Sequence, residues 1–225
     1  MWVIPKLTPL FRERMNDILG VYTEPLPKGH EVHCFDETPK QMLSTPCGQQ
    51  SMKPGHPCRI DYEYKRHGKM NVFVAVAPFE GTRTVSITKR RTAKDTADFL
   101  WKYCMEEHKE ALHIELVLDN LNTHKEKSLG KIWSKEQMQH FCDRVTFHFT
   151  PCHASWLNMA ELEIHCLKTQ GLKRRIASEK EMIRIVDGIV QERNARQAMI
   201  SWNFTKEKAR DKFQTYIPRI NLEWY

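Results

Sequence analysis

The chain has 225 residues, of which 40% are hydrophobic and 28% are charged, and it contains no apolar run near the roughly 18 residues that a membrane-spanning helix requires. This composition predicts a globular protein with one sizeable core and argues against a membrane protein. The 35 lysines and arginines outnumber the 28 acidic residues, and the net charge of +7 favours an anionic partner.

Seven cysteines are scattered along the chain, and no two of them form a C-x-x-C pair. This pattern argues against a disulfide framework or a zinc ribbon and favours a reducing cytosol. The first residues, MWVIP, have neither the charged start nor the apolar segment of a signal peptide. We therefore expect a cytoplasmic protein.

The first predicted elements are a helix and a strand. Residues 9–20 place apolar side chains at helical spacing, and Gly20 is the predicted helix end. A segment rich in proline and glycine then precedes residues 31–37 (EVHCFDE), a β-rich run that ends in carboxylates. We predict that Asp36 lies at the end of this strand.

The next region predicts a surface loop, a β-hairpin and a helix. Residues 44–58 contain three prolines and two glycines, so we expect them to form an exposed loop. Residues 71–88 read as two strands joined by a turn at 78–81. Thr92 then caps a predicted helix that runs to His108.

The centre of the chain contains a short apolar run that stops at an aspartate. The run LVL at residues 116–118 is typical of a strand buried on both faces, and Asp119 follows it directly. The polar segment 120–124 then lies at the carboxyl end of the strand, where open α/β sheets place their chemistry. A helix at 134–142 and a strand at 145–149 complete a predicted α/β order.

Residues 155–167 predict a helix with an apolar seam. At about 100° per residue, Glu161 lies on the rim of that seam, about 40° from Leu157. Glu163 lies about 200° from Glu161, so both cannot address one site. Further along, an apolar stripe at 178–199 predicts core or dimer packing, and the last helix is predicted at 206–216, before Pro218.

Asp36, Asp119 and Glu161 are therefore the candidate metal ligands. Their carboxylates supply the hard oxygen ligands that a pair of Mg²⁺ or Mn²⁺ ions requires. Any one of them taken alone is more often a solvated acidic residue. Two aspartates predicted at strand ends and a glutamate on the following helix together favour the metal site.

Four segments resemble, in the expected order, the motifs of bacterial insertion-sequence transposases of the 630 family, relatives of mariner: residues 35–41 (FDETPKQ), 59–68 (RIDYEYKRHG), 116–124 (LVLDNLNTH) and 155–161 (SWLNMAE). The resemblance implies an RNase H-like α/β fold, with a central mixed β-sheet flanked by helices, and a D-D-E metal triad at Asp36, Asp119 and Glu161. It implies metal-dependent DNA strand cleavage and strand transfer at mobile-element ends, with two Mg²⁺ or Mn²⁺ ions. It further implies a homodimer on double-stranded DNA in the bacterial nucleoid.

The resemblance also suggests a division of the chain. We expect an N-terminal linker helix (1–30), the RNase H-like catalytic domain (31–176) and a C-terminal helical extension packed on that domain (177–225). Family members carry helix-turn-helix modules ahead of the catalytic domain, and we expect them to be absent here, so that a separate chain could carry them. The alternatives are an inactive or truncated DNA-binding remnant and an RNase H-like nuclease of another family.

Further candidates for orienting metal ligands or contacting DNA are Glu37, Asn120, His124, Asn158, Lys65, Arg66, Arg90, Arg91, Arg174 and Arg175. Glu37 points away from Asp36 if the strand continues. His124 either orients a ligand or caps a helix at the surface. The basic residues together favour a groove for the DNA backbone.

Two weaker readings concern residues near the third carboxylate. Trp156 either stacks on a base or belongs to the core, and the core is the commoner role of such an aromatic residue. A zinc-binding interaction module would use Cys152, His153, His165 and Cys166, but their spacing resembles no common zinc site.

Overall fold

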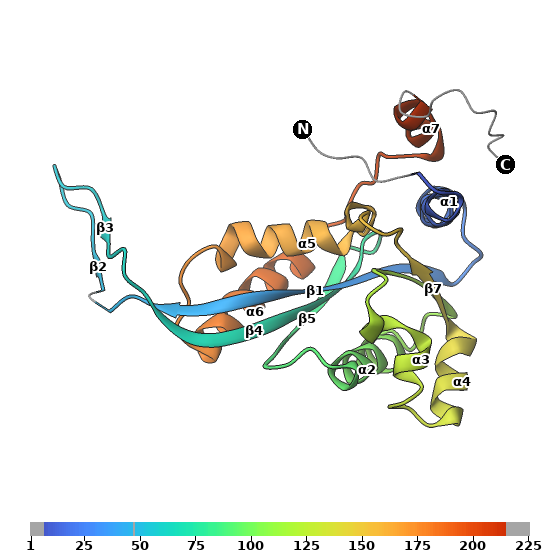
Figure 1. Cartoon of the computed structure of the whole chain (residues 1–225), viewed down its shortest axis with the longest axis horizontal. Helices are drawn as coiled ribbons and strands as arrows, with labels where there is room; N and C mark the ends of the chain where they lie inside the picture. The colour runs from blue at the N-terminus through green and yellow to red at the C-terminus, as the bar shows by residue number, and fades with distance from the viewer. Residues whose placement is uncertain (1–6, 47, 215–225) are drawn as a thin grey trace.

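The computed structural model describes residues 7–46 and 48–214, and Figure 1 shows an elongated molecule built on one central sheet. Five strands form this sheet in the order β5-β4-β1-β6-β7. They are β1 (His30–Ser44), β4 (Lys65–Ala77), β5 (Thr82–Thr88), β6 (His113–Leu118) and β7 (Val145–Phe149). β1 pairs antiparallel with β4 and parallel with β6, so the predicted mixed sheet is confirmed.

Helices flank the sheet on both faces, as predicted. The α-helices are α1 (Pro9–Thr23), α2 (Ala93–Trp101), α3 (Glu126–Leu129), α4 (Lys135–Arg144), α5 (Ala160–Leu167), α6 (Glu179–Ala195) and α7 (Lys206–Gln214). The shorter helical segments are η1 (Lys102–Glu107), η2 (Asn122–His124), η3 (Ser155–Leu157) and η4 (Lys168–Leu172). In Figure 1, α2, α3 and α4 lie on one side of the sheet and α5 and α6 lie on the other.

Strand β4 shows why the central strands are apolar throughout. Phe73 packs with the α2 side of the core, whereas Val72 and Val74 pack with the α5 and α6 side. All three side chains are fully buried. Burying each one contributes roughly 1.5–3 kcal/mol, so both faces of the sheet hold helices in place.

Strand β1 is longer than the sequence indicated. The prediction that it ends at Asp36 is wrong, because β4 pairs with it from Cys34 to Ser44. Only the first part of β1 also pairs with β6, over His30–Cys34. Asp36 therefore lies inside a continuous strand, two residues beyond Cys34, where the pairing of β1 with β6 ends.

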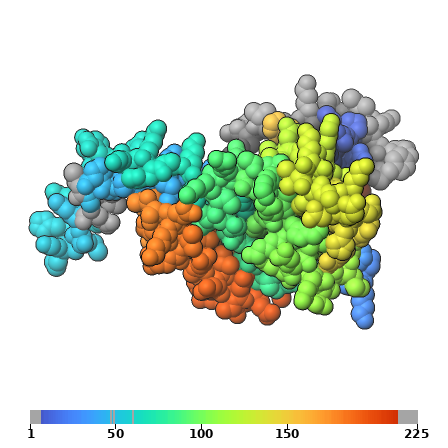
Figure 2. Space-filling view, turned by 90° about the horizontal axis from the view of Figure 1, so that it is seen from below, coloured from blue at the N-terminus to red at the C-terminus, as the bar shows by residue number. Residues whose placement is uncertain are grey.

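The region predicted as an exposed loop forms the tip of an arm. Residues 45–46 and 48–64 leave the sheet between β1 and β4, and Figure 2 shows this segment projecting from the body of the molecule. Short strands β2 (Gln49–Gln50) and β3 (Arg59–Ile60) pair within the arm. The expected surface position is confirmed, since Met52 is 75% and Tyr62 is 85% exposed.

Helix α1 continues past its predicted end at Gly20, so that prediction is wrong. Tertiary packing explains the extra turn, because Tyr22 is buried and its hydroxyl donates to the carbonyl of Leu157 at 2.9 Å. Phe11 on α1 and Phe213 on α7 belong to one apolar cluster, which also includes part of β1. The proposed division at 1–30, 31–176 and 177–225 stays a prediction.

Two other predicted helices differ in detail. The helix begun at Thr92 becomes π-helical from Lys102, and the helix predicted from 155 starts as η3 before α5 begins at Ala160. The predicted helix at 206–216 is found as α7, while its last residues and the stop at Pro218 lie outside the described residues. Within the described ranges, no helix is both long and apolar enough to cross a membrane.

Candidate active site

The register of two parallel strands brings Asp36 and Asp119 to one place. Cys34 of β1 pairs with Val117 of β6, and each aspartate lies two residues beyond that pair. The two side chains are therefore at the same level of the sheet, although 83 positions of sequence separate them. Asp36 is 6% exposed, and the side chain of Asp119 is 24% exposed.

Glu161 reaches the same place from the first turn of α5. The side chain of Asn158 holds the start of this helix. Its Nδ2 donates to the backbone carbonyl of Phe35 at 2.8 Å, and its Oδ1 accepts from the Ala160 N–H at 3.1 Å. Asn158 is fully buried, so it is not placed to touch DNA. Its contact with the residue before Asp36 fixes Glu161 against β1.

The charges of Glu161 and Asp119 both act on the carboxyl group of Asp36. Burial, together with the charges of Glu161 and Asp119, raises the pKa of Asp36 to about 7. The N–H of Glu37, which donates to Asp36 at 2.7 Å, opposes this rise. Like charges so arranged repel one another, and a divalent cation among them would remove the repulsion.

His124 links Asp119 to Glu37 beneath the site. It is fully buried, with Nδ1 2.6 Å from Oδ1 of Asp119 and Nε2 2.9 Å from Oε2 of Glu37. Burial alone would lower the pKa of His124, but the neighbouring carboxylates of Asp119 and Glu37 raise it to about 9. Among the described residues, neither Nε2 nor Oε2 has a well-aligned hydrogen bond, so the contact is chiefly an ion pair.

The three carboxylates do not form a single compact cage of ligand atoms. Within the described part of the chain, their ligand oxygens do not all lie within 4.8 Å of one another. Two ions about 3.5–4 Å apart need ligands spread over a wider space and leave positions for phosphate and water. All three donors are carboxylates, the oxygen ligands that Mg²⁺ and Mn²⁺ accept.

Hollows lie on either side of the triad. One, of about 340 Å³, is lined by Glu161, Trp156, His165 and Lys168 among others. Trp156 is 44% exposed, and its ring meets Phe204 edge to face at 5.4 Å between centroids.

The second hollow, of about 410 Å³, contains Asn120, Arg14 and His153. Asn120 is exposed, so its amide faces solvent beside Asp119. The basic side chains in both hollows suit a polyanion that runs past the triad.

The predicted basic residues are distributed over several surfaces. Lys65, Arg66, Arg90, Arg91 and Arg174 are exposed. Arg91 lies 3.9 Å from Glu37, and the Arg66 guanidinium lies over the ring of Tyr64.

Arg175, unlike the exposed basic residues, binds backbone carbonyls of the protein itself. Its guanidinium donates to the carbonyls of Asp61, Tyr62 and Glu63 at the base of the arm.

The structure also answers the predictions about Glu163 of α5 and about the zinc alternative. Glu163 points away from the triad, as its helical angle indicated, and its carboxylate accepts from Arg193 at 2.8 and 2.9 Å. The zinc alternative fails in the described residues, because Cys152, His153, His165 and Cys166 do not form a cluster of ligand atoms.

Sequence reasoning did not find the link between Glu37 and His124. The alternation of β1 indicated that Glu37 points away from Asp36, and that is where His124 lies. A histidine five residues after Asp119 gave the only signal, since a tight turn such as η2 returns that side chain toward the strand end.

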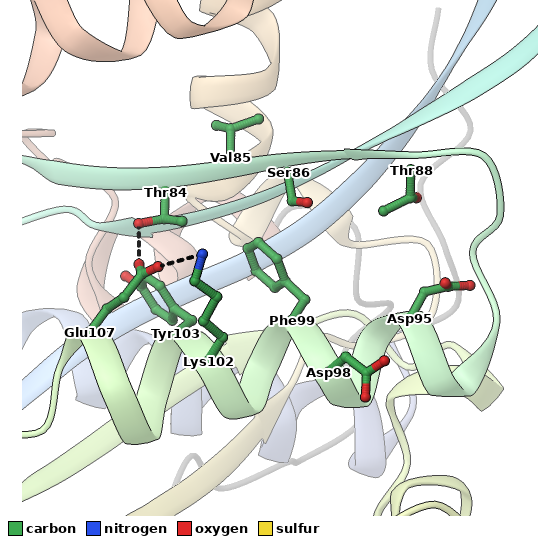
Figure 3. A pocket seen from close by; sticks show the side chains of 10 residues that line it. All are labelled: Thr84, Val85, Ser86, Thr88, Asp95, Asp98, Phe99, Lys102, Tyr103 and Glu107. Carbon is green, nitrogen blue, oxygen red and sulfur yellow. Dashed lines mark hydrogen bonds and ion pairs between the residues drawn. The ribbon is translucent and has the colours of Figure 1, made fainter. Parts of the chain in front are cut away.

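A third hollow, of about 300 Å³, lies away from the triad, between β5 and the helix formed by α2 and η1 (Figure 3). Thr84 donates to Glu107 across it at 2.7 Å, and Lys102 lies 3.5 Å from the same carboxylate. These contacts join the end of the helix to the sheet.

Comparison with known proteins identifies a family and a set of similar solved structures. Residues 31–183, about two thirds of the chain, match the family described as DDE superfamily endonuclease. No curated protein sequence matches the chain.

Solved structures of Mos1 mariner transposase are among those similar to this chain. The Mos1 mariner paired end complex with Mn has 15% identity and a TM-score of 0.57, covering 88% of this chain and 61% of its own. A pre-cleavage Mos1 transpososome has 13% identity and a TM-score of 0.54, covering 90% of this chain and 67% of its own. The catalytic domain of Mos1 mariner transposase has 11% identity and a TM-score of 0.50, covering 89% of this chain and all of that domain.

These identities are low, so the likeness shows a shared fold. The predicted RNase H-like fold is thereby confirmed. This chain spans about 61% of the length of the first of these relatives.

Proposed function

The chain belongs to the DDE superfamily endonucleases, and from this membership we propose that it is a transposase catalytic domain that cleaves and transfers DNA strands at mobile-element ends. The observation that carries the proposal is the in-register placement of Asp36 and Asp119 beside Glu161. These three residues are proposed as the catalytic metal ligands.

Two Mg²⁺ or Mn²⁺ ions are proposed as the cofactors. Divalent metals serve this superfamily, and Mos1 paired end complexes have been solved with Mn and with Mg. When bound, such ions activate water or a DNA 3′-hydroxyl and stabilise the leaving oxygen in an in-line displacement. The nucleophile is then water or DNA, and no covalent bond between protein and DNA is required.

The chain's own residues prepare the site for this chemistry. Asp36 ionises fully only above its raised pKa of about 7, so the carboxylate is a better ligand at slightly alkaline pH. His124 fixes the orientation of Asp119, and Glu37 holds the other side of the imidazole ring. Asn158 fixes the helix that carries Glu161.

Double-stranded DNA, as element end and as target, is the proposed substrate. The net charge of +7 and the exposed basic residues support contacts with the phosphate backbone. Mos1 transposase has been solved as a paired-end complex, which supports a homodimer on DNA. We place this activity in the bacterial nucleoid, with a separate chain carrying helix-turn-helix modules as the source of sequence recognition.

A plasmid-nicking assay tests the proposed function. We expect Mn²⁺-dependent nicking of supercoiled DNA that falls at least about a hundredfold in Asp119→Asn. Asp143→Asn is the matched control, because Asp143 is exposed on α4 and contacts only Gln139 among the contacts described for its side chain. Equal nicking by Asp119→Asn and wild type would reject the triad.

The alternative of a DNA-binding remnant predicts a different result. Such a protein would bind DNA with strong salt dependence, but it would be indifferent to Mg²⁺ and to Asp119→Asn. Cleavage that depends on the triad but shows no preference for element ends would favour an RNase H-like nuclease of another family.

A further inference from the structure

A second group of metal-ligating side chains lies at the beginning of β1. Glu31 and His33 are two residues apart, so they project from the same face of the strand. His108 approaches them from the end of η1. Within the described ranges, this is the group of histidine, cysteine or acidic residues whose ligand atoms all lie within 4.8 Å of one another.

This group is separate from the triad. His33 and Asp36 are three residues apart in β1 and so point to opposite faces of the sheet. At about 3.4 Å per residue, their backbones are roughly 10 Å apart. An ion held by the first group would therefore have no ligand in common with the triad.

The distances suit a tetrahedral ion. Nε2 of His33 lies 2.9 Å from Oε2 of Glu31, and Nδ1 of His108 lies 3.5 Å from the same oxygen. Zinc bonds of about 2.0–2.1 Å at tetrahedral angles place neighbouring ligand atoms about 3.3 Å apart. Small movements of these side chains would therefore admit the ion.

A neighbouring hydroxyl prepares His33 as a ligand. Tyr103, the second residue of the π-helical segment, places its hydroxyl 2.7 Å from Nδ1 of His33. Histidine ligands of metals usually donate their second N–H to such a partner, which leaves the other nitrogen free to bind. Both Tyr103 and His33 are buried, so this orientation is held by packing.

The local charges also favour a cation. Burial and the neighbouring His33 lower the pKa of His108. The carboxylate of Glu31, which lies beside both histidines, supplies negative charge to the group. Glu80, in the turn between β4 and β5, is close enough to His33 and Glu31 to interact electrostatically with them.

We propose that Glu31, His33 and His108 bind a transition-metal ion of the Zn²⁺ class, with Glu80 or water as the fourth ligand. Two imidazole nitrogens and one carboxylate are a ligand set that zinc accepts, whereas Mg²⁺ prefers oxygen alone. The ion would join the start of β1 to the end of η1. This site does not depend on the proposed DNA chemistry.

The competing arrangement needs no metal. Tyr103 could donate to Nδ1 of His33, and Nε2 of His33 could donate to Glu31, which would satisfy these groups internally. That arrangement predicts no zinc binding at this place, so a metal titration separates the two.

The test is calorimetric Zn²⁺ titration in an Asp119→Asn background, which weakens any contribution from the triad. We expect one binding event that is at least tenfold weaker after His108→Ala. His140→Ala is the matched control, because His140 is exposed on α4 and should leave the affinity unchanged. Absence of the event, or equal affinity in His108→Ala, would overturn the proposal.

A second variant tests the role of the hydroxyl. Tyr103→Phe retains the ring and should weaken Zn²⁺ binding about 10–100-fold, as loss of a partner to a ligating histidine does. Thermal unfolding with and without Zn²⁺ supplies an independent readout, since metal bound to the folded state raises the Tm. A Zn²⁺-dependent rise as large in His108→Ala as in the parent would contradict the site.

Discussion

Asp36 is the residue at which the chemistry of the site opposes folding most strongly. Folding buries its carboxyl group beside Glu161 and Asp119, and its pKa rises from about 4 to about 7. A carboxyl group with a raised pKa binds its proton more tightly in the folded state. The metal-free protein therefore loses stability from this group as pH rises from about 4 to about 7.

Asp36→Asn should remove this loss. We expect the free energy of unfolding of the variant, relative to wild type, to increase by about 1.4 kcal/mol per pH unit between pH 4 and 7 and to level off above pH 7. Urea unfolding at several pH values in the presence of a chelator measures it, with Asp143→Asn as control. If the difference in free energy of unfolding between Asp36→Asn and wild type does not change with pH, the pKa of Asp36 is not raised in the folded protein.

His124 has the opposite charge but shifts stability in the same direction. Its pKa is raised to about 9, so its contribution is fully present below about pH 6.5 and is lost as pH rises through 9. Removing one partner of a buried charge pair usually costs about 3–5 kcal/mol. We expect His124→Ala to lose about this much at pH 6 and less above pH 9, measured by urea unfolding.

The control for His124 is the exposed His140. His140→Ala should change the free energy of unfolding by no more than about 0.5 kcal/mol. An equal cost of His124→Ala at pH 6 and pH 9.5 would mean that the imidazole contributes packing alone.

Helix α5 carries two glutamates with different environments. Glu163 is fully buried between Arg193 and Arg83, with its Oε1 3.5 Å from Nε of Arg83. Glu161 is partly exposed beside Asp36. One residue therefore holds the helix to α6 and β5, and the other faces the site.

Matched substitutions on this helix should separate stability from metal binding. Glu163→Ala leaves buried arginine charges without their partner, so we expect a loss of about 3–5 kcal/mol in urea unfolding. Glu161→Gln should cost less than about 1 kcal/mol without metal and should weaken Mn²⁺ binding. Comparable losses of stability in the two variants would refute this division.

The side chain of Arg175 joins the base of the arm to the body. Arg175 donates to three successive carbonyls of the arm and to Thr45. Arg175→Ala should increase the rate of trypsin cleavage at Lys53 and Arg59 several-fold, with little change in Tm, because the arm lies outside the core. Arg174→Ala is the control, and equal cleavage of the two variants would assign the restraint elsewhere.

At the scale of the whole molecule, the sequence predicted the elements better than their lengths. Apolar runs and caps correctly indicated the hairpin, the helix that begins after Thr92 and the buried strand before Asp119. Periodicity could not show that β1 continues past Asp36, because the continuation depends on pairing with β4. Likewise, Gly20 gives a local stop signal that burial of Tyr22 overrides.

The candidate site was only partly predictable, because local patterns do not show which distant segments meet. Local sequence patterns predicted each of the three carboxylates separately, and the family resemblance predicted that they form one site. The contact between His124 and Glu37, and the group formed by Glu31, His33 and His108, depend on distant segments meeting in space. Local patterns do not contain that information.

The central claim is that Asp36, Asp119 and Glu161 form one divalent-metal site, and calorimetric Mn²⁺ titration tests it without knowledge of the DNA ends. We predict binding by the wild type and by His108→Ala, and at least about tenfold weaker binding by Asp119→Asn. The affinity should increase as pH rises toward 7, because Asp36 must lose its proton to bind. Mn²⁺ binding that is absent from the wild type, or that survives unchanged in Asp119→Asn, would contradict the claim.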